Sequence, residues 1–212
     1  GLMHMNQLEN PGLNELIRVM KLDKSQMKSS DIGFKIAPAI NAAGRLGSAL
    51  ESLELFMSEN TGLIEQLAEQ LKETNDERRE VEKNILEQAE KQVNQSDDFI
   101  VVKGDNWNDG VVGIVASRLV ERFRKPAIVM TRKRDCYKGS GRSIGQFHLL
   151  EALNACQDEI RQYGGHQFAA GLTVELERFE AFKDKLNQYA SIHLTEFDRA
   201  RRHRYYDHLT ID

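Results

Sequence analysis

The feature that most constrains the fold is a polar interruption inside a long helical pattern. Apolar side chains recur at helical spacing in both parts of residues 62–95, at Leu63, Leu67, Leu71, Val81, Ile85, Ala89 and Val93. Residues 72–80, between the two parts, contain no apolar side chain. A helix that is polar on all sides at its middle commonly bridges two bodies across solvent. At ~1.5 Å per residue, ~34 residues span roughly 50 Å, which is too long for one small core. The pattern therefore predicts two bodies joined by a helix, with a coiled-coil arm as the alternative.

Composition sets the broad class of the protein. The 212 residues suffice for one large or two small domains, and the 40% hydrophobic content allows a packed core. A net charge of −4 argues against a protein that coats nucleic acid through its overall charge. No apolar run has the length of a membrane span, and Cys136 and Cys156 form neither a disulfide framework nor a metal-binding pair. These observations predict a soluble cytoplasmic protein with no membrane partner.

Charge is distributed unevenly along the chain. Residues 51–98 hold fourteen acidic and five basic side chains, whereas residues 117–142 hold nine basic and two acidic ones. A run of charge is commonly just a solvated face, but the basic block leads into Gly139-Ser140-Gly141-Arg142-Ser143. Backbone amides, hydroxyls and a guanidinium are the donors that bind phosphate. This segment is a candidate phosphate-binding loop.

The remaining pattern divides the chain into four parts. Strands are expected at residues 99–103, 126–131, 137–144 and 168–174. Helices are expected at 110–123, 147–163 and 178–192. This alternation predicts an α/β domain over residues 98–192. A helical segment at residues 1–59 and the connecting helix at 60–97 precede this domain. Residues 193–212, which follow it, are first basic and then strand-like.

Two further glycine-bearing segments are candidates for ligand binding. Residues 41–47 place Arg45 in a turn of small residues. Gly164-Gly165-His166 follows the helix expected at 147–163, so the glycines alternatively form a helix stop and His166 a packed turn residue. Neither segment has metal ligands beside it, and the chain is predicted to hold no metal of its own.

Four segments in this order resemble the C-terminal part of the RecJ exonucleases, a family within the DHH phosphoesterase superfamily. They are residues 41–47, Trp107 with 110–118, 139–144, and 164–166 with 169–171. The resemblance implies that residues 1–59 are the end of a DHH domain and residues 98–192 a DHH-associated domain. It also implies that residues 193–212 lead into an oligonucleotide-binding fold.

The resemblance further implies a single-stranded-DNA-specific 5′→3′ exonuclease of DNA recombination and repair. In this family two Mn or Mg ions, held by the DHH domain, activate water against a phosphodiester. Ser140, Gly141, Arg142, Ser143, Gly164 and Gly165 would bind the strand's phosphates. His166 would assist catalysis at the scissile phosphate, and Arg45 would line the same groove. The chain alone is predicted to be inactive, and single-strand-binding protein is a partner expected from the family only.

Two other functions remain open from the sequence. One is a phosphodiesterase of short RNA or cyclic dinucleotides, whose DHH-associated domain typically has an extra glycine before the histidine. The other is a non-catalytic nucleic-acid-binding module like that appended to alanyl-tRNA synthetase. An upstream Asp-His-His motif in the full reading frame would distinguish a nuclease from such a module.

Overall fold

The computed structural model describes residues 9–200, which divide into two compact units. The first comprises the described residues up to Gln88 together with Asn106–Val115. The second comprises Ala89–Asp105 and the described residues from Ala116 onward. The chain therefore passes between the units more than once.

The first unit is helical, as expected for residues 1–59. Its elements before the long helix are α2 (Pro11–Val19), η1 (Lys24–Gln26), α3 (Ser29–Asp31), η2 (Ile32–Ile36), α4 (Ala37–Leu46) and α5 (Ala49–Met57). Asn10 caps α2 by accepting a hydrogen bond from the Leu13 amide, 2.9 Å long. The core of the unit gathers buried aliphatic side chains from these helices and from the start of the next one, including Leu16, Leu55 and Leu71.

The long helix is α6 (Thr61–Glu90), capped by Asn60, whose side chain accepts from the Leu63 amide. The polar middle of this helix is more buried than expected. Asn75, Arg78 and Glu82 are buried, and the Arg78 guanidinium donates to both other side chains, at 3.2 Å and 2.5 Å. The helix is therefore not solvated on all sides at its middle. The three polar groups satisfy one another along one face, which lets that face be buried.

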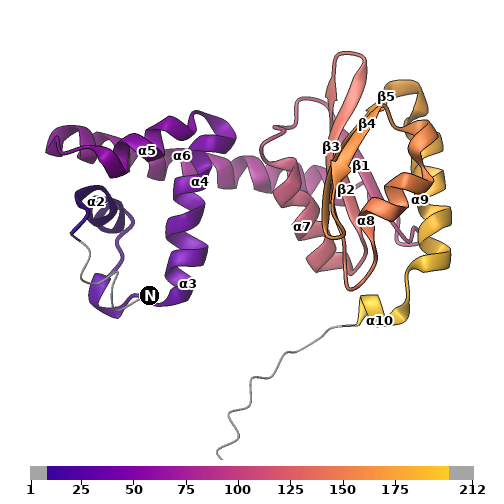
Figure 1. The fold of residues 1–212 in the computed structure, drawn as a ribbon, viewed down its shortest axis with the longest axis horizontal. Helices are drawn as coiled ribbons and strands as arrows, with labels where there is room; N and C mark the ends of the chain where they lie inside the picture. The colour runs from indigo at the N-terminus through magenta and orange to yellow at the C-terminus, as the bar shows by residue number, and fades with distance from the viewer. Residues whose placement is uncertain (1–8, 201–212) are drawn as a thin grey trace, which may run out of the picture. The chain divides into compact units, whose positions relative to one another are not determined.

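The second unit is an α/β fold, which confirms the expected fold class. Its five strands are β1 (Ile100–Gly104), β2 (Ala127–Lys133), β3 (Cys136–Arg142), β4 (Gln162–Gly165) and β5 (Ala169–Glu175). They form one sheet in the order β1-β2-β3-β5-β4, with β1 and β2 parallel and the other neighbours antiparallel. The helices beside the sheet are α7 (Val112–Phe123), α8 (Leu149–Ala155) and α9 (Phe179–His193), and α10 (Glu196–Arg199) follows (Figure 1).

Two local expectations are wrong. The helix expected at 147–163 ends at Ala155, and after η3 (Gln157–Glu159) the chain enters β4 at Gln162. Gly164 and Gly165 thus belong to an edge strand and do not stop a helix. Arg45 lies in the last turn of α4, so residues 41–47 are largely helical where a turn was expected. The strand-like part of the exit, at residues 201–212, lies outside the described residues.

Among residues 9–200, no helix is both long enough and apolar enough to cross a membrane.

Candidate phosphate-binding site

The sheet brings two of the predicted segments to either side of one strand. Arg142 on β3 is in register with Ala169 on β5, and the His166 amide donates to the Ala169 carbonyl from the other side, at 2.9 Å. Neighbouring strands lie ~4.8 Å apart, so the backbones at Arg142 and His166 are about 10 Å apart. Arg142 and His166 are therefore neighbours of the same residue of β5, on its two sides.

Arg142 is oriented by its own strand. Its guanidinium donates to the Ser140 hydroxyl at 2.8 Å and to the Gly141 carbonyl at 2.7 Å. Ser140 and Arg142 are two residues apart and therefore point to the same face of the sheet. Gly141 points to the other face, where a Cβ atom would come within 3.0 Å of Ile128 and 3.1 Å of Leu149. The guanidinium and hydroxyl form a pair, and Gly141 lets the strand pack closely behind them.

Ser143 is engaged in the turn that follows β3. Its amide donates to the Phe168 carbonyl at 2.9 Å, and its hydroxyl donates to the Phe147 carbonyl at 2.5 Å. A hydroxyl has one proton to donate. The donor that a phosphate would require from Ser143 is therefore already used within the protein.

His166 is exposed at the end of β4. The Phe168 amide donates to its Nδ1 atom at 3.3 Å, and the two rings meet edge to face with centroids 6.2 Å apart. Because Nδ1 accepts a hydrogen bond, this contact assigns the proton of the neutral ring to Nε2. Nε2–H is a donor suited to an anionic oxygen.

The two glycines before His166 have different reasons to be glycine. Gly165 has φ +157°, and a Cβ atom there would lie 2.3 Å from the Ala169 carbonyl oxygen, so no other residue fits. Gly164 is exposed, and a Cβ atom there would meet nothing within 4 Å. The fold therefore requires glycine at position 165 but not at position 164.

Arg45 is not grouped with these residues, because it lies in the first unit. Its guanidinium donates to the Gly110 carbonyl at 2.9 Å. A Cβ atom on Gly110 would come within 2.4 Å of the Arg45 carbonyl oxygen. Arg45 therefore fastens residues 106–115 to the end of α4.

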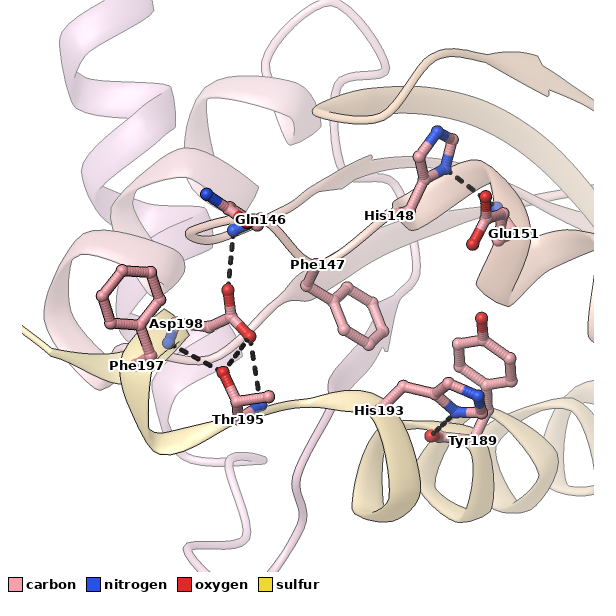
Figure 2. Close-up of a pocket in the computed structure, with 9 residues that line it drawn as sticks. All are labelled: Gln146, Phe147, His148, Glu151, Tyr189, His193, Thr195, Phe197 and Asp198. Atoms are coloured by element: carbon pink, nitrogen blue, oxygen red, sulfur yellow. Dashed lines mark hydrogen bonds between the residues drawn. The ribbon is translucent and has the colours of Figure 1, made fainter.

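A depression in the same unit, of about 470 Å³, is lined by none of the predicted site residues (Figure 2). Buried Asp198 accepts hydrogen bonds there from the Gln146 amide at 2.6 Å and from the Thr195 amide and hydroxyl. The rings of Tyr189 and His193 stack beside it, 3.9 Å apart. This cluster was not predicted from the sequence, although Thr195 and Asp198 have the spacing of a helix-capping box. Its polar groups serve to attach α10.

Within residues 9–200, no three His, Cys, Asp or Glu side chains cluster closely enough to hold a metal ion. The described residues therefore do not fit a catalytic metal centre.

Comparison with known proteins places this geometry in context. The family model of the DHHA1 domain matches residues 96–191. The chain is 38% identical over 203 residues to the single-stranded-DNA-specific exonuclease RecJ of Bacillus subtilis. This match covers 93% of the chain and 26% of the Bacillus subtilis protein. Crystal structures of RecJ from Thermus thermophilus with Mg²⁺ and with Mn²⁺ match with TM-scores of 0.83 and 0.82 at 31% identity. Each match covers 91% of this chain, and 30% and 28% of those chains, respectively.

Proposed function

Since this chain belongs to the RecJ family, we propose that it is the substrate-gripping C-terminal part of a longer 5′→3′ exonuclease specific for single-stranded DNA. Recombination and repair of DNA are the processes such an enzyme serves. One observation carries the proposal: Arg142 and His166 flank the same residue of β5 from its two sides. We infer that the Arg142 guanidinium, the Ser140 hydroxyl and the His166 imidazole N–H contact the same bound strand.

The ligand of this site is the 5′ end of the strand. The Arg142 guanidinium and the Ser140 hydroxyl hold oxygens of the 5′ phosphate, and the His166 Nε2–H approaches the scissile phosphate as negative charge develops during cleavage. Charge-assisted hydrogen bonds of this kind are roughly twice as strong as neutral ones. Gly164 and Gly165 shape the strand beneath the ligand, and Ser143 positions the turn.

The metal ions of the reaction belong to another part of the longer protein. The Mg²⁺ and Mn²⁺ in the two RecJ structures support divalent-metal chemistry in the family. The described residues of this chain do not fit such a centre, so no metal-dependent step is assigned to them. Binding to single-strand-binding protein remains an expectation from the family.

The 212-residue chain should bind single-stranded DNA weakly and should not cleave it. We expect micromolar or weaker affinity in a fluorescence titration, because the chain holds only part of the groove and its net charge of −4 opposes binding. Affinity should fall as salt rises, because phosphate contacts release counterions. In the presence of Mn²⁺, a 5′-labelled strand should stay intact with the chain alone and be shortened by the longer protein.

Two results would contradict this proposal. Salt-independent affinity would mean that phosphates are not the ligand. Shortening of the strand that co-purifies with the 212-residue chain through several columns would place a complete active site within it.

A further inference from the structure

Phe168 lies beside His166 in the three-residue link, residues 166–168, between β4 and β5. Its side chain is 53% exposed. A single exposed apolar side chain is common and needs no explanation by itself. Within residues 9–200, however, His166 carries the one aromatic ring that Phe168 contacts, and the two rings meet edge to face with an interplanar angle of 71°. The exposed ring of Phe168 therefore has a specific neighbour.

The backbone of this link is held by two other segments of the second unit. The Gln167 carbonyl accepts a hydrogen bond from the Leu149 amide at 3.0 Å, and Leu149 begins α8. The Phe168 carbonyl accepts from the Ser143 amide at 2.9 Å, in the turn after β3. Neither hydrogen bond uses the side chain of Phe168. The path of the link is thus fixed by its neighbours, and the Phe168 ring is available for another role.

The fixed backbone places the Phe168 amide against the imidazole of His166. This amide donates to Nδ1 at 3.3 Å, and the hydrogen bond made by one ring nitrogen determines which nitrogen carries the proton. An exposed histidine can otherwise turn its ring over, by about 180° around χ2, and exchange its two tautomers. The amide selects one ring orientation and the Nε2–H tautomer. The Phe168 ring restricts the remaining rotation, because aromatic pairs prefer the edge-to-face arrangement.

We propose that Phe168 is a positioning residue for His166. Its amide sets the tautomer and its ring holds the imidazole plane, so that Nε2–H keeps one direction. The inference rests on the proposed function, because it takes His166 as the group that meets the scissile phosphate. A donor that is oriented before the reaction loses little freedom in the transition state. Phe168 thus acts on cleavage only through the histidine.

The first test is spectroscopic and requires no activity. Long-range ¹H–¹⁵N spectra of the 212-residue chain, recorded at mildly alkaline pH where imidazole is neutral, distinguish Nε2–H from Nδ1–H. His166→Ala identifies the His166 signals by their loss. We expect the Nε2–H form, with nuclear Overhauser contacts between the His166 and Phe168 rings. Phe168→Tyr should preserve both features. Phe168→Leu keeps the amide but removes the aromatic ring, and should give a mixture of tautomers at an unchanged melting temperature.

The second test measures kcat and the dissociation constant of a single strand in the longer enzyme. Phe168→Leu should lower kcat roughly three- to tenfold, the range expected for the loss of one aromatic pair, and leave strand affinity unchanged. Phe168→Tyr should restore kcat. Phe197→Leu makes the same change at a 60% exposed phenylalanine of α10 and should behave like the unaltered enzyme. In the His166→Ala background, Phe168→Leu should have no further effect, because the residue it positions is absent.

The outcomes separate this inference from the proposed function. An Nδ1–H or mixed tautomer in the unaltered chain would overturn the inference alone. So would a kcat that falls with His166→Ala but not with Phe168→Leu. If Phe168→Leu slows the His166→Ala enzyme further, Phe168 acts on the strand directly and is not a positioning residue. If His166→Ala leaves kcat unchanged, the proposed role of His166 fails and the role of Phe168 in cleavage fails with it.

Discussion

At the scale of single residues, the proposed grip depends on preorganisation. Arg142 already donates to the Ser140 hydroxyl and to the backbone of its own strand, so its guanidinium is placed before any ligand arrives. The planar fork of a guanidinium can then offer two parallel hydrogen bonds to a phosphate, which an ammonium cannot reproduce.

Replacing Arg142 with alanine in the longer enzyme should lower kcat/KM roughly ten- to a hundredfold. The reason is the loss of a charge-assisted contact worth about 1.5–3 kcal/mol, at ~1.4 kcal/mol per factor of ten. Arg142→Lys should recover little of this loss. Steady-state kinetics on a 5′-phosphorylated single strand measures the effect, with melting temperatures as the control. A loss of activity that only follows the loss of folded protein would make Arg142 a structural residue.

His166→Ala should affect the reaction differently. If the imidazole meets the phosphate mainly in the transition state, kcat should fall while the affinity for the strand stays nearly unchanged. Measuring kcat and the dissociation constant separately distinguishes this role from ground-state binding. If His166→Ala instead weakened the binding of the strand and left kcat unchanged, His166 would contact the substrate only in the ground state.

At the scale of helices and strands, periodicity predicted most elements, and the failures have local causes. The four expected strands and the helices α7 and α9 are present. Apolar residues form continuous buried runs in β1 and β2, buried and less buried residues alternate in β5, and apolar residues recur every three to four positions in the two helices. Strand β4 was missed because it has only four residues, two of them glycines, and its burial pattern shows no alternation. What defines β4 is its hydrogen bonding to β5, a long-range contact that no local pattern reveals.

The middle of α6 shows the same limit. Composition marked residues 72–80 as fully polar, which is correct, but burial depends on whether polar groups find partners. Arg78 lies three residues after Asn75 and four before Glu82, the spacings at which side chains meet on one helix face. The spacing of these three residues could have predicted their hydrogen bonds from the sequence. The packing that buries them could not be predicted, because it depends on contacts with other parts of the fold.

Attachment of α10 should depend on Asp198. Replacing it with alanine leaves the Gln146 amide and the Thr195 hydroxyl without their acceptor, and hydrogen bonds to charged groups contribute about 1.5–3 kcal/mol. We expect a decrease of about 2 kcal/mol in the free energy of unfolding, measured by urea titration with circular dichroism. Glu196→Ala, at an exposed position of the same helix, should change it by less than about 0.5 kcal/mol. Equal effects of the two substitutions would show that the Asp198 contacts contribute nothing to stability.

At the scale of the whole molecule, the sequence-defined domain and the compact units do not coincide. The DHHA1 match runs continuously over residues 96–191, yet Asn106–Val115 clusters with the first unit. Those ten residues include buried Trp107, Val111, Val112 and Val115. A sequence pattern follows the chain, whereas a core is assembled in space, so the boundary of the DHHA1 domain cannot reveal which core these side chains join.

Trp107 makes this division measurable, because it is the single tryptophan of the chain. It is 4% exposed, and its indole N–H donates to the Gln88 side chain at 3.1 Å. A shortened chain of residues 96–200 lacks Gln88, which accepts the indole hydrogen bond, and lacks the helices of the unit with which residues 106–115 cluster. Its tryptophan emission should shift to longer wavelength than that of the 212-residue chain and be quenched more readily by acrylamide. The urea-unfolded full chain gives the fully exposed limit for both measurements. If emission and quenching in the shortened chain match those of the folded full chain, residues 96–200 bury Trp107 without the first unit, and the assignment of residues 106–115 to that unit is wrong.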